Sequence, residues 1–167
     1  GSAFADSEYR ANLTDGIAAD TFVYGTNNAD WFGFINTGSA STGNAPDGKG
    51  IITIDLGGVC EITGISTNVQ AGVNDANAVQ FEYINSYYSI DGSWYDYIGT
   101  FNPDNTKSAP FWHSKTLDTP LYARYIKFNY KVYDDVLSLV NEIKVYGTQM
   151  TTAKADRKST RLNSSHE

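Results

Sequence analysis

The sequence has few of the residues that build disulfides or catalytic centres. Its one cysteine, Cys60, excludes an internal disulfide and any metal site made of several cysteines. Cys60 is flanked by apolar residues, which favours a small buried or half-buried side chain over a nucleophile. His113 is the only histidine among residues 1–155, so a histidine metal cluster or a relay of several histidines is excluded there. Adjacent strand residues face opposite ways, so Ser114 beside His113 does not predict a nucleophile and base.

Basic residues and long apolar runs are also scarce. Twelve Lys and Arg stand against nineteen Asp and Glu, which gives a formal net charge of −7 at pH 7. Nucleic acids and anionic membrane surfaces call for clustered basic residues, so we expect neither as a partner. No stretch approaches the roughly 20 apolar residues of a membrane-spanning helix.

Aromatic residues, by contrast, are plentiful: twelve Tyr, eight Phe and three Trp in 167 residues, enough to build one sizeable core. Short runs rich in β-branched and aromatic residues alternate with clusters of Gly, Asn, Asp and Pro, as in β-sandwiches and barrels. In one run Ile52, Ile54 and Leu56 share a face, and Gly57-Gly58 is expected to end the strand. Strands are predicted at residues 52–56, 62–69, 80–90, 95–101, 111–117, 123–130 and 141–146, with a hairpin turn at Asp91-Gly92.

Four pieces of the sequence, taken in order, resemble the discoidin family, also called coagulation-factor type C, and the related family 32 carbohydrate-binding modules. They are LTDG at 13–16, ITIDLG at 52–57, YSIDGSW at 88–94, and ARYIKF at 123–128 leading to NEIKVYG at 141–147. The resemblance implies an all-β jelly-roll sandwich of about eight mainly antiparallel strands, the galactose-binding-like fold.

The two ends of the chain are expected to lie outside this module, which is assigned to residues 6–150. Residues 1–5 have the small-x-small form of a signal-peptidase site and are interpreted as the remnant of a signal peptide. Residues 151–155 are interpreted as the start of a linker. Residues 156–167 resemble the translation of a sequencing adapter, so we interpret the sequence as metagenomic and exclude this tail from the fold.

The resemblance also implies a structural calcium ion. Calcium takes six to eight oxygen ligands and suits irregular loops rich in carboxylates and carbonyls. In the family, a loop near the start of the domain binds the ion and a glutamate of the last strand completes the shell. The alternative is that these carboxylates are ordinary turn and surface groups. The candidate ligands are Asn12, Asp15, Asp20, Thr21 and Glu142.

In the family, the ligand site lies on loops at one edge of the sandwich. A sugar site stacks an aromatic ring on a pyranose and binds the hydroxyls with short polar side chains. Residues 26–50 form a long stretch rich in Gly, Ser and Asn, and long loops are usually functional. Trp31 is the first choice for stacking, and the alternative is that it seals the end of the sandwich. The predicted ligand-binding residues are Trp31, Phe32, Asn74, Asn77, Tyr133 and Asp134.

Other polar and aromatic residues are assigned to the scaffold. Trp94 and Trp112 are expected in the core, and Arg124 is expected to anchor a buried hydrogen bond. The combination of loop His, Arg and Asn that grips galactose in family 32 modules is not recognisable in this sequence, so the ligand's identity stays open.

These features predict a non-catalytic carbohydrate-binding module of a secreted or cell-surface bacterial protein, located outside the cell. Its expected partner is a glycan or polysaccharide, and the module is expected to be a monomeric part of a larger chain. The alternative is a structural or protein-adhesion sandwich without affinity for glycans. The two differ in whether the loops form a concave polar surface or the aromatics pack inward.

Overall fold

The computed structural model describes residues 32–35, 49–74, 77–79, 81–107, 109–132 and 137–150. All the regular structure in these ranges is β-strand. The strands are β1 (Phe32–Ile35), β2 (Lys49–Gln70), β3 (Gly72–Asn74), β4 (Asn77–Val79), β5 (Phe81–Ser89), β6 (Asp96–Phe101), β7 (Phe111–Val132) and β8 (Leu137–Gln149). The predicted all-β class is confirmed.

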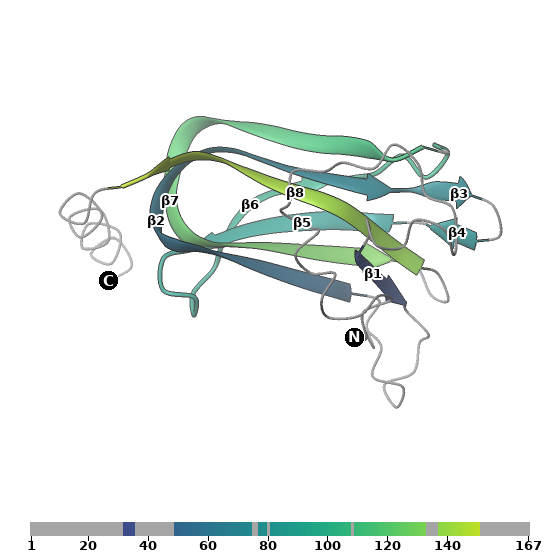
Figure 1. Cartoon of the computed structure of the whole chain (residues 1–167), viewed down its shortest axis with the longest axis horizontal. Helices are drawn as coiled ribbons and strands as arrows, with labels where there is room; N and C mark the ends of the chain where they lie inside the picture. Colours follow the sequence, from purple (N-terminus) through teal and green to yellow (C-terminus); the bar gives the residue numbers. More distant parts are fainter. Residues whose placement is uncertain are drawn as a thin grey trace.

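Two long strands, β2 and β7, run through both layers of the sandwich. Residues 49–55 of β2 pair with 125–131 of β7, and residues 60–69 pair with 111–123, with a break in register between Asp55 and Cys60. Figure 1 shows both strands curling over at the same end of the molecule. One layer, which we call the front layer, contains residues 49–55 of β2, residues 125–131 of β7, β5 and β6. The other, the back layer, contains residues 60–69 of β2, residues 111–123 of β7, and β8, β1, β3 and β4.

The bends in β2 and β7 show that the predicted strand boundaries were wrong at two places. Residues 52–56 were expected to form a strand ended by Gly57-Gly58, followed by a separate strand at 62–69, but β2 passes through both segments. Gly57 adopts a φ of +82°, which is open to glycine, and its N–H donates a 2.8 Å hydrogen bond to the Asp55 carboxylate. This local geometry redirects the strand instead of ending it. The segments predicted at 111–117 and 123–130 are likewise two parts of β7.

The core lies between the two layers. Inward-facing residues alternate with outward-facing ones along each strand, as expected for a half-buried sheet. Tyr130 of the front layer bridges the layers through a 2.9 Å hydrogen bond with Thr67 of the back layer, and its ring stacks against Phe128. The buried apolar residues are Ile52, Ile62, Ile65, Val69, Ala71, Phe81, Ile84, Ala123, Ile126, Phe128, Tyr130, Val132, Leu139, Val140 and Ile143.

Two further predictions are confirmed. The Asp91-Gly92 turn joins β5 to β6, and the Asp91 carboxylate accepts hydrogen bonds from the N–H groups of Ser93 and Trp94 at 2.8 and 3.0 Å. Cys60 is half-buried, and this burial raises the pKa of its thiol. A thiol with a raised pKa is a poor nucleophile at neutral pH, so Cys60 acts as a packing residue.

Candidate ligand-binding end of the sandwich

The sheet topology gathers the strands that flank the predicted ligand-binding segments. β1 pairs with the start of β8, so that Phe32 lies opposite Val140 and Ile35 lies opposite Leu137. β4 also contacts the start of β8, through Val79 and Leu137. In Figure 1, β1, β3 and β4 lie at the end of the sandwich away from the bends in β2 and β7. Three segments distant in sequence therefore meet at one end, which we call the loop end.

The described candidate residues are Phe32, Asn74 and Asn77. Phe32 is the first residue of β1, which differs from its expected place in a long loop. Asn74 and Asn77 face each other across the β3–β4 hairpin, at its tip. Trp31, Tyr133 and Asp134 lie outside the described residues. In the sequence, Trp31 precedes β1, and Tyr133 and Asp134 follow β7.

A turn at residues 104–107 contacts β3 and the start of β5, next to the β3–β4 hairpin. The Asn105 side chain accepts a 2.9 Å hydrogen bond from the Phe81 N–H and donates a 2.8 Å bond to the Phe81 carbonyl. Gly72 adopts a φ of +115°, and a Cβ there would lie 1.9 Å from the Lys107 carbonyl oxygen. The close approach requires glycine. Asn105 was not among the predicted residues, although its Asn-Pro-Asp-Asn setting is typical of a turn.

Of the five predicted calcium ligands, only Glu142 lies within the described residues. It is 1% exposed and lies opposite Asn68 in the β2–β8 ladder. A carboxylate this buried requires hydrogen-bond donors or a cation nearby. Within the described ranges, no group of three or more His, Cys, Asp or Glu residues is arranged to hold a metal. The calcium site stays a prediction, because Asn12, Asp15, Asp20 and Thr21 fall outside the described residues.

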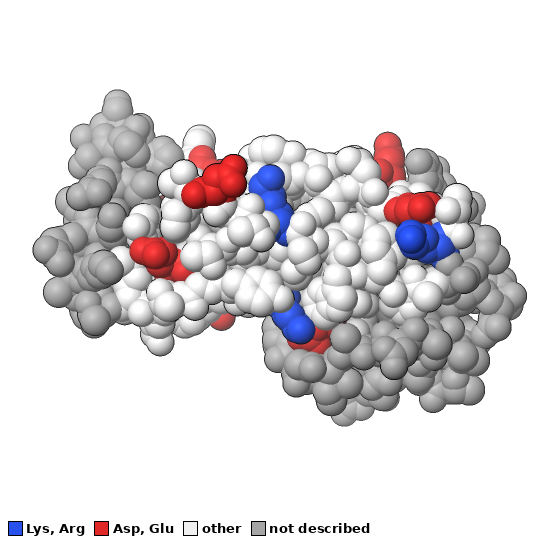
Figure 2. Space-filling model, turned by 90° about the horizontal axis from the view of Figure 1, so that it is seen from above, with Lys and Arg blue, Asp and Glu red and all other residues white. Residues whose placement is uncertain are grey.

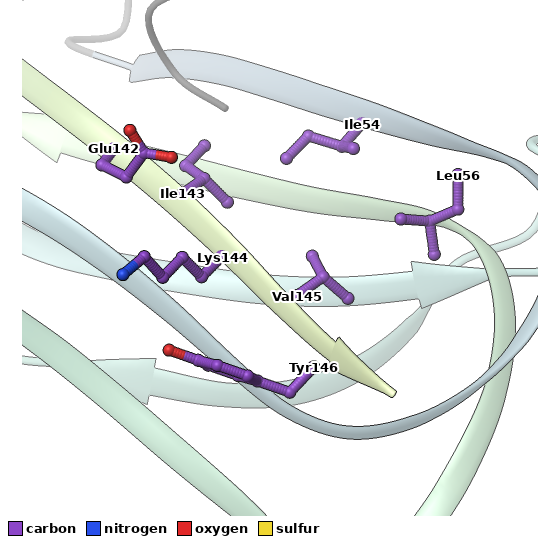
Figure 3. Close-up of a pocket in the computed structure, with 7 residues that line it drawn as sticks. All are labelled: Ile54, Leu56, Glu142, Ile143, Lys144, Val145 and Tyr146. Atoms are coloured by element: carbon purple, nitrogen blue, oxygen red, sulfur yellow. The ribbon is translucent and has the colours of Figure 1, made fainter. Parts of the chain in front are cut away.

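A depression of about 470 Å³ lies beside β8, where the two layers meet. Figure 3 shows Ile54 and Leu56 of β2 facing Ile143 and Val145 of β8, with Lys144 on the other side of that strand. Glu142, Lys144 and Tyr146 also border the depression, but their side chains lie on the other side of β8 from Ile143 and Val145 (Figure 3). The walls that face each other are aliphatic. The depression is therefore the margin of the core and does not resemble a sugar site.

Comparison with known proteins gives the family. The family model described as F5/8 type C domain matches residues 6–143. The chain belongs to the F5/8 type C family. Among curated proteins, no sequence matches this F5/8 type C domain significantly.

Solved structures with the same fold include carbohydrate-binding modules and a lectin. CpGH89CBM32-6 of Clostridium perfringens is 17% identical, with a TM-score of 0.55 over 87% of this chain and 90% of that one. CpGH89CBM32-5 of the same organism, in complex with GalNAc-β-1,3-galactose, is 16% identical, with a TM-score of 0.51 over 70% and 74%. A fucolectin from striped bass serum, Morone saxatilis, is 12% identical, with a TM-score of 0.58 over 84% and 42%. These likenesses show the galactose-binding-like β-sandwich.

Three expectations about scaffold residues of the F5/8 type C domain were wrong. Trp94 was expected in the core but is 64% exposed, because the tight Asp91-Gly92 turn carries it beyond the strands. Trp112 is half-buried rather than buried in the core, with the Lys144 ammonium 4.6 Å from its ring centre. Arg124 makes no buried anchor: it forms a partly exposed ion pair with Asp55 at 2.9 Å. That hydrogen bond, helped by the Gly57 N–H, lowers the pKa of Asp55 to about 2.

His113 lies on the inner side of β7, between two phenylalanine rings. Its ring centre is 4.2 Å from that of Phe111 and 5.9 Å from that of Phe101. Both ring nitrogens are shielded from solvent and have no hydrogen-bond partner among the described residues. Burial lowers the pKa of His113. Ser114 faces the other way and contacts the Ser66 hydroxyl at 2.5 Å, so it is not a partner for the imidazole.

Proposed function

We propose that this F5/8 type C domain is a non-catalytic carbohydrate-binding module of a secreted or cell-surface protein. The observation that carries the proposal is the meeting of β1, the β3–β4 hairpin and the start of β8 at the loop end. Phe32, Asn74 and Asn77 belong to β1 and the hairpin, and Trp31, Tyr133 and Asp134 lie within two residues of β1 or β7 in the sequence. Such a site requires convergence, because one sugar ring must touch an aromatic face and several polar groups together.

The similar structures support glycans as the ligand class. Two of those compared are named as family 32 carbohydrate-binding modules, one of them bound to a disaccharide, and a third is a fucolectin. Their identities of 12–17% make this an argument from shared architecture. It suggests the class of ligand and leaves the particular sugar to experiment.

The charge distribution favours an uncharged ligand. On the face seen in Figure 2, the acidic and basic side chains of the described residues are scattered and form no patch of one sign. Nucleic acids and anionic lipids bind to clustered Lys and Arg. In the part of the chain that the structure describes, no helix is long and apolar enough to cross a bilayer.

The residues with catalytic potential support a binding role over a catalytic one. His113 has shielded ring nitrogens, Ser114 points away from it, and burial raises the pKa of the Cys60 thiol. A nucleophile needs an activating base within hydrogen-bond reach. None of these three side chains makes such a pair.

We expect a structural calcium ion to link Glu142 to the loop that contains Asp15 and Asp20. An ion bound only by the folded state stabilises that state, with an effect that grows with the ion's concentration. The melting temperature should therefore rise in millimolar calcium and fall in chelator. Glu142→Gln should remove the calcium dependence, whereas Glu61→Gln, a half-buried glutamate of β2, should retain it. A melting temperature that does not change with calcium concentration would refute this site.

The experiment that tests the function is binding of the full chain to a panel of plant, animal and bacterial glycans, in calcium and in chelator. Trp31→Ala should lose binding if the loop end holds the site. Tyr146→Ala is the control, because Tyr146 is a similarly large aromatic, 49% exposed, on the outer side of the back layer. No binding across the panel by a protein that melts cooperatively would reject the proposal and indicate a structural or adhesive module.

A further inference from the structure

Several tyrosines lie on the outer side of the front layer and belong neither to the core nor to the loop end. The strand register places Thr53, Lys127, Tyr87 and Tyr97 in one row across β2, β7, β5 and β6. The next row contains Ile51, Asn129, Asn85 and Thr100. We call the part of this surface formed by Tyr87, Tyr95, Tyr97, Lys127, Asn85 and Thr100 the tyrosine face.

A lysine holds two of these rings in place. The Lys127 ammonium lies 3.9 Å from the centre of the Tyr95 ring and 5.1 Å from that of Tyr87. Cation–π contacts of this kind are attractive, and here the charge of Lys127 interacts with rings of the protein itself. Tyr87 also meets Tyr97 edge to face, at 5.9 Å between ring centres. Three tyrosines are thus ordered before any ligand arrives, which lowers the entropic cost of binding.

The hydroxyl groups of the tyrosine face form a directed chain. The Thr100 hydroxyl donates to the Asn85 side-chain oxygen at 2.5 Å. Since its proton is committed to Asn85, Thr100 accepts the hydrogen bond that it shares with Tyr97, and the Tyr97 hydroxyl is the donor. The Tyr97 oxygen keeps acceptor capacity on a side chain that is 59% exposed. A ligand hydroxyl can donate to that oxygen while stacking on the ring.

The chemistry of this surface suits a neutral glycan better than a protein. Its aromatic rings are interleaved with hydroxyl and amide groups, and the one exposed aliphatic side chain in the two rows is Ile51, at their β2 end. Protein interfaces have more apolar, desolvated centres. Lys127 is covered by rings, and Arg124 and Asp55 at the nearby bend neutralise each other. An uncharged ligand rich in hydroxyls is the best match.

We propose that the tyrosine face is a second binding surface, which takes a segment of a neutral polysaccharide by stacking on Tyr97. This inference rests on the proposed function only in the class of ligand, because it uses different residues on a different side of the sandwich. β5 runs from the β3–β4 hairpin at the loop end to the Asp91-Gly92 turn, so Tyr87 and Tyr97 lie toward the opposite end. Two separated surfaces would let one module engage a long chain twice, and linked contacts raise the overall affinity.

The test compares the full chain and four variants, Trp31→Ala, Tyr97→Ala, Tyr97→Phe and Tyr146→Ala. The probes are the polysaccharide that binds best in the glycan panel and its constituent monosaccharide. Tyr97→Ala should weaken polysaccharide binding by about 3- to 10-fold, the size of one aromatic contact, and should leave monosaccharide binding unchanged. Trp31→Ala should abolish monosaccharide binding, and Tyr146→Ala should match the parent chain. Tyr97→Phe should keep most of the affinity, because it retains the ring.

The outcomes separate the two proposals. Tyr97→Ala that binds polysaccharide like the parent chain overturns the tyrosine face and leaves the loop end standing. Polysaccharide binding that survives Trp31→Ala but is lost in Tyr97→Ala supports the tyrosine face and rejects the loop end. Absence of binding by the parent chain rejects both. The Tyr97 and Tyr146 variants should melt like the parent chain, since exposed side chains contribute little to stability.

Discussion

Tyr130 and Tyr97 lie on opposite sides of the front layer and show two uses of one side chain. Tyr130 faces inward, is fully buried, and bonds to the Thr67 hydroxyl at 2.9 Å. Burial raises the pKa of its phenol far above the ordinary value. Tyr97 faces outward, is mostly exposed, and bonds to Thr100 at the surface. The first holds the two layers together, and the second is available to a ligand.

The difference comes from strand alternation. Along β7, Ile126, Phe128 and Tyr130 are buried, whereas Lys127 and Asn129 between them face out. A shift of one residue would exchange the two sets, so the register decides which aromatics form core and which form surface. Composition alone cannot make that distinction. The two sides of the front layer should therefore respond differently to mutation.

The largest contrast is expected between Phe128→Ala and Tyr97→Ala. Phe128 is fully buried and stacks on Tyr130, so its removal should lower the free energy of unfolding by about 3–5 kcal/mol. Tyr97→Ala should change that free energy by no more than about 0.5 kcal/mol. Urea denaturation of the three proteins measures both. Equal losses would show that Tyr97 belongs to the packed structure and would break the comparison.

A smaller contrast is expected when only the hydroxyl is removed. Tyr130→Phe leaves the buried Thr67 hydroxyl without this partner, so we expect a loss of about 1–2 kcal/mol. Tyr97→Phe exposes Thr100 to water, which replaces the lost hydrogen bond, and stability should be unchanged. A double variant, Tyr130→Phe with Thr67→Val, should recover part of the loss, because both polar groups are then absent.

His113 is a further inward-facing side chain, and it differs from Tyr130 in that its shielded ring nitrogens have no hydrogen-bond partner among the described residues. Desolvation lowers its pKa, so the unfolded chain, with a value near 6.5, binds the proton more readily than the folded one. Stability is therefore full above about pH 6.5 and falls as the pH drops below it. His113→Phe should flatten this part of the profile of melting temperature against pH. A profile identical to that of the parent chain would contradict the assignment.

The smallest effect is expected at the ion pair of Arg124 and Asp55, which is partly open to solvent. The pKa of Asp55 is lowered to about 2, so its contribution is present above the ordinary value of 3.8 and is lost as the pH falls toward 2. Exposed pairs are weakened by water and salt. Arg124→Gln should shift the melting temperature only slightly at neutral pH. In 1 M NaCl, the difference in melting temperature between this variant and the parent chain should become smaller.

Alternation and turn chemistry were enough to predict most strands of this domain. The run at 52–56 has one buried or half-buried face, and the Asp91-Gly92 turn closes a hairpin, as expected. The bends were missed because Gly57-Gly58 can either end a strand or redirect it, and only the pairing with β7 decides which. Trp94 was misplaced for a related reason. Its exposure follows from the shape of the turn, which residue types do not specify.

The candidate site was predicted unevenly. Asn74 and Asn77 lie together at a hairpin tip, as two polar residues of one loop should. The contribution of β1 could not be read from its sequence, because a four-residue strand inside a long polar stretch has too few positions to show a period. The tyrosine face was missed because it is assembled from several strands. Its residues are separated by up to 42 positions, from Asn85 to Lys127.

The most direct test of the proposed function is to map a bound glycan by the backbone amide NMR shifts of the full chain, using the best ligand from the panel. Binding at the loop end should move the amides of Phe32–Ile35, Asn74, Asn77 and Leu137 at monosaccharide concentrations that leave the core amides of β7 unchanged. Shifts confined to other parts of the domain, or no saturable shifts with any glycan, would contradict the account.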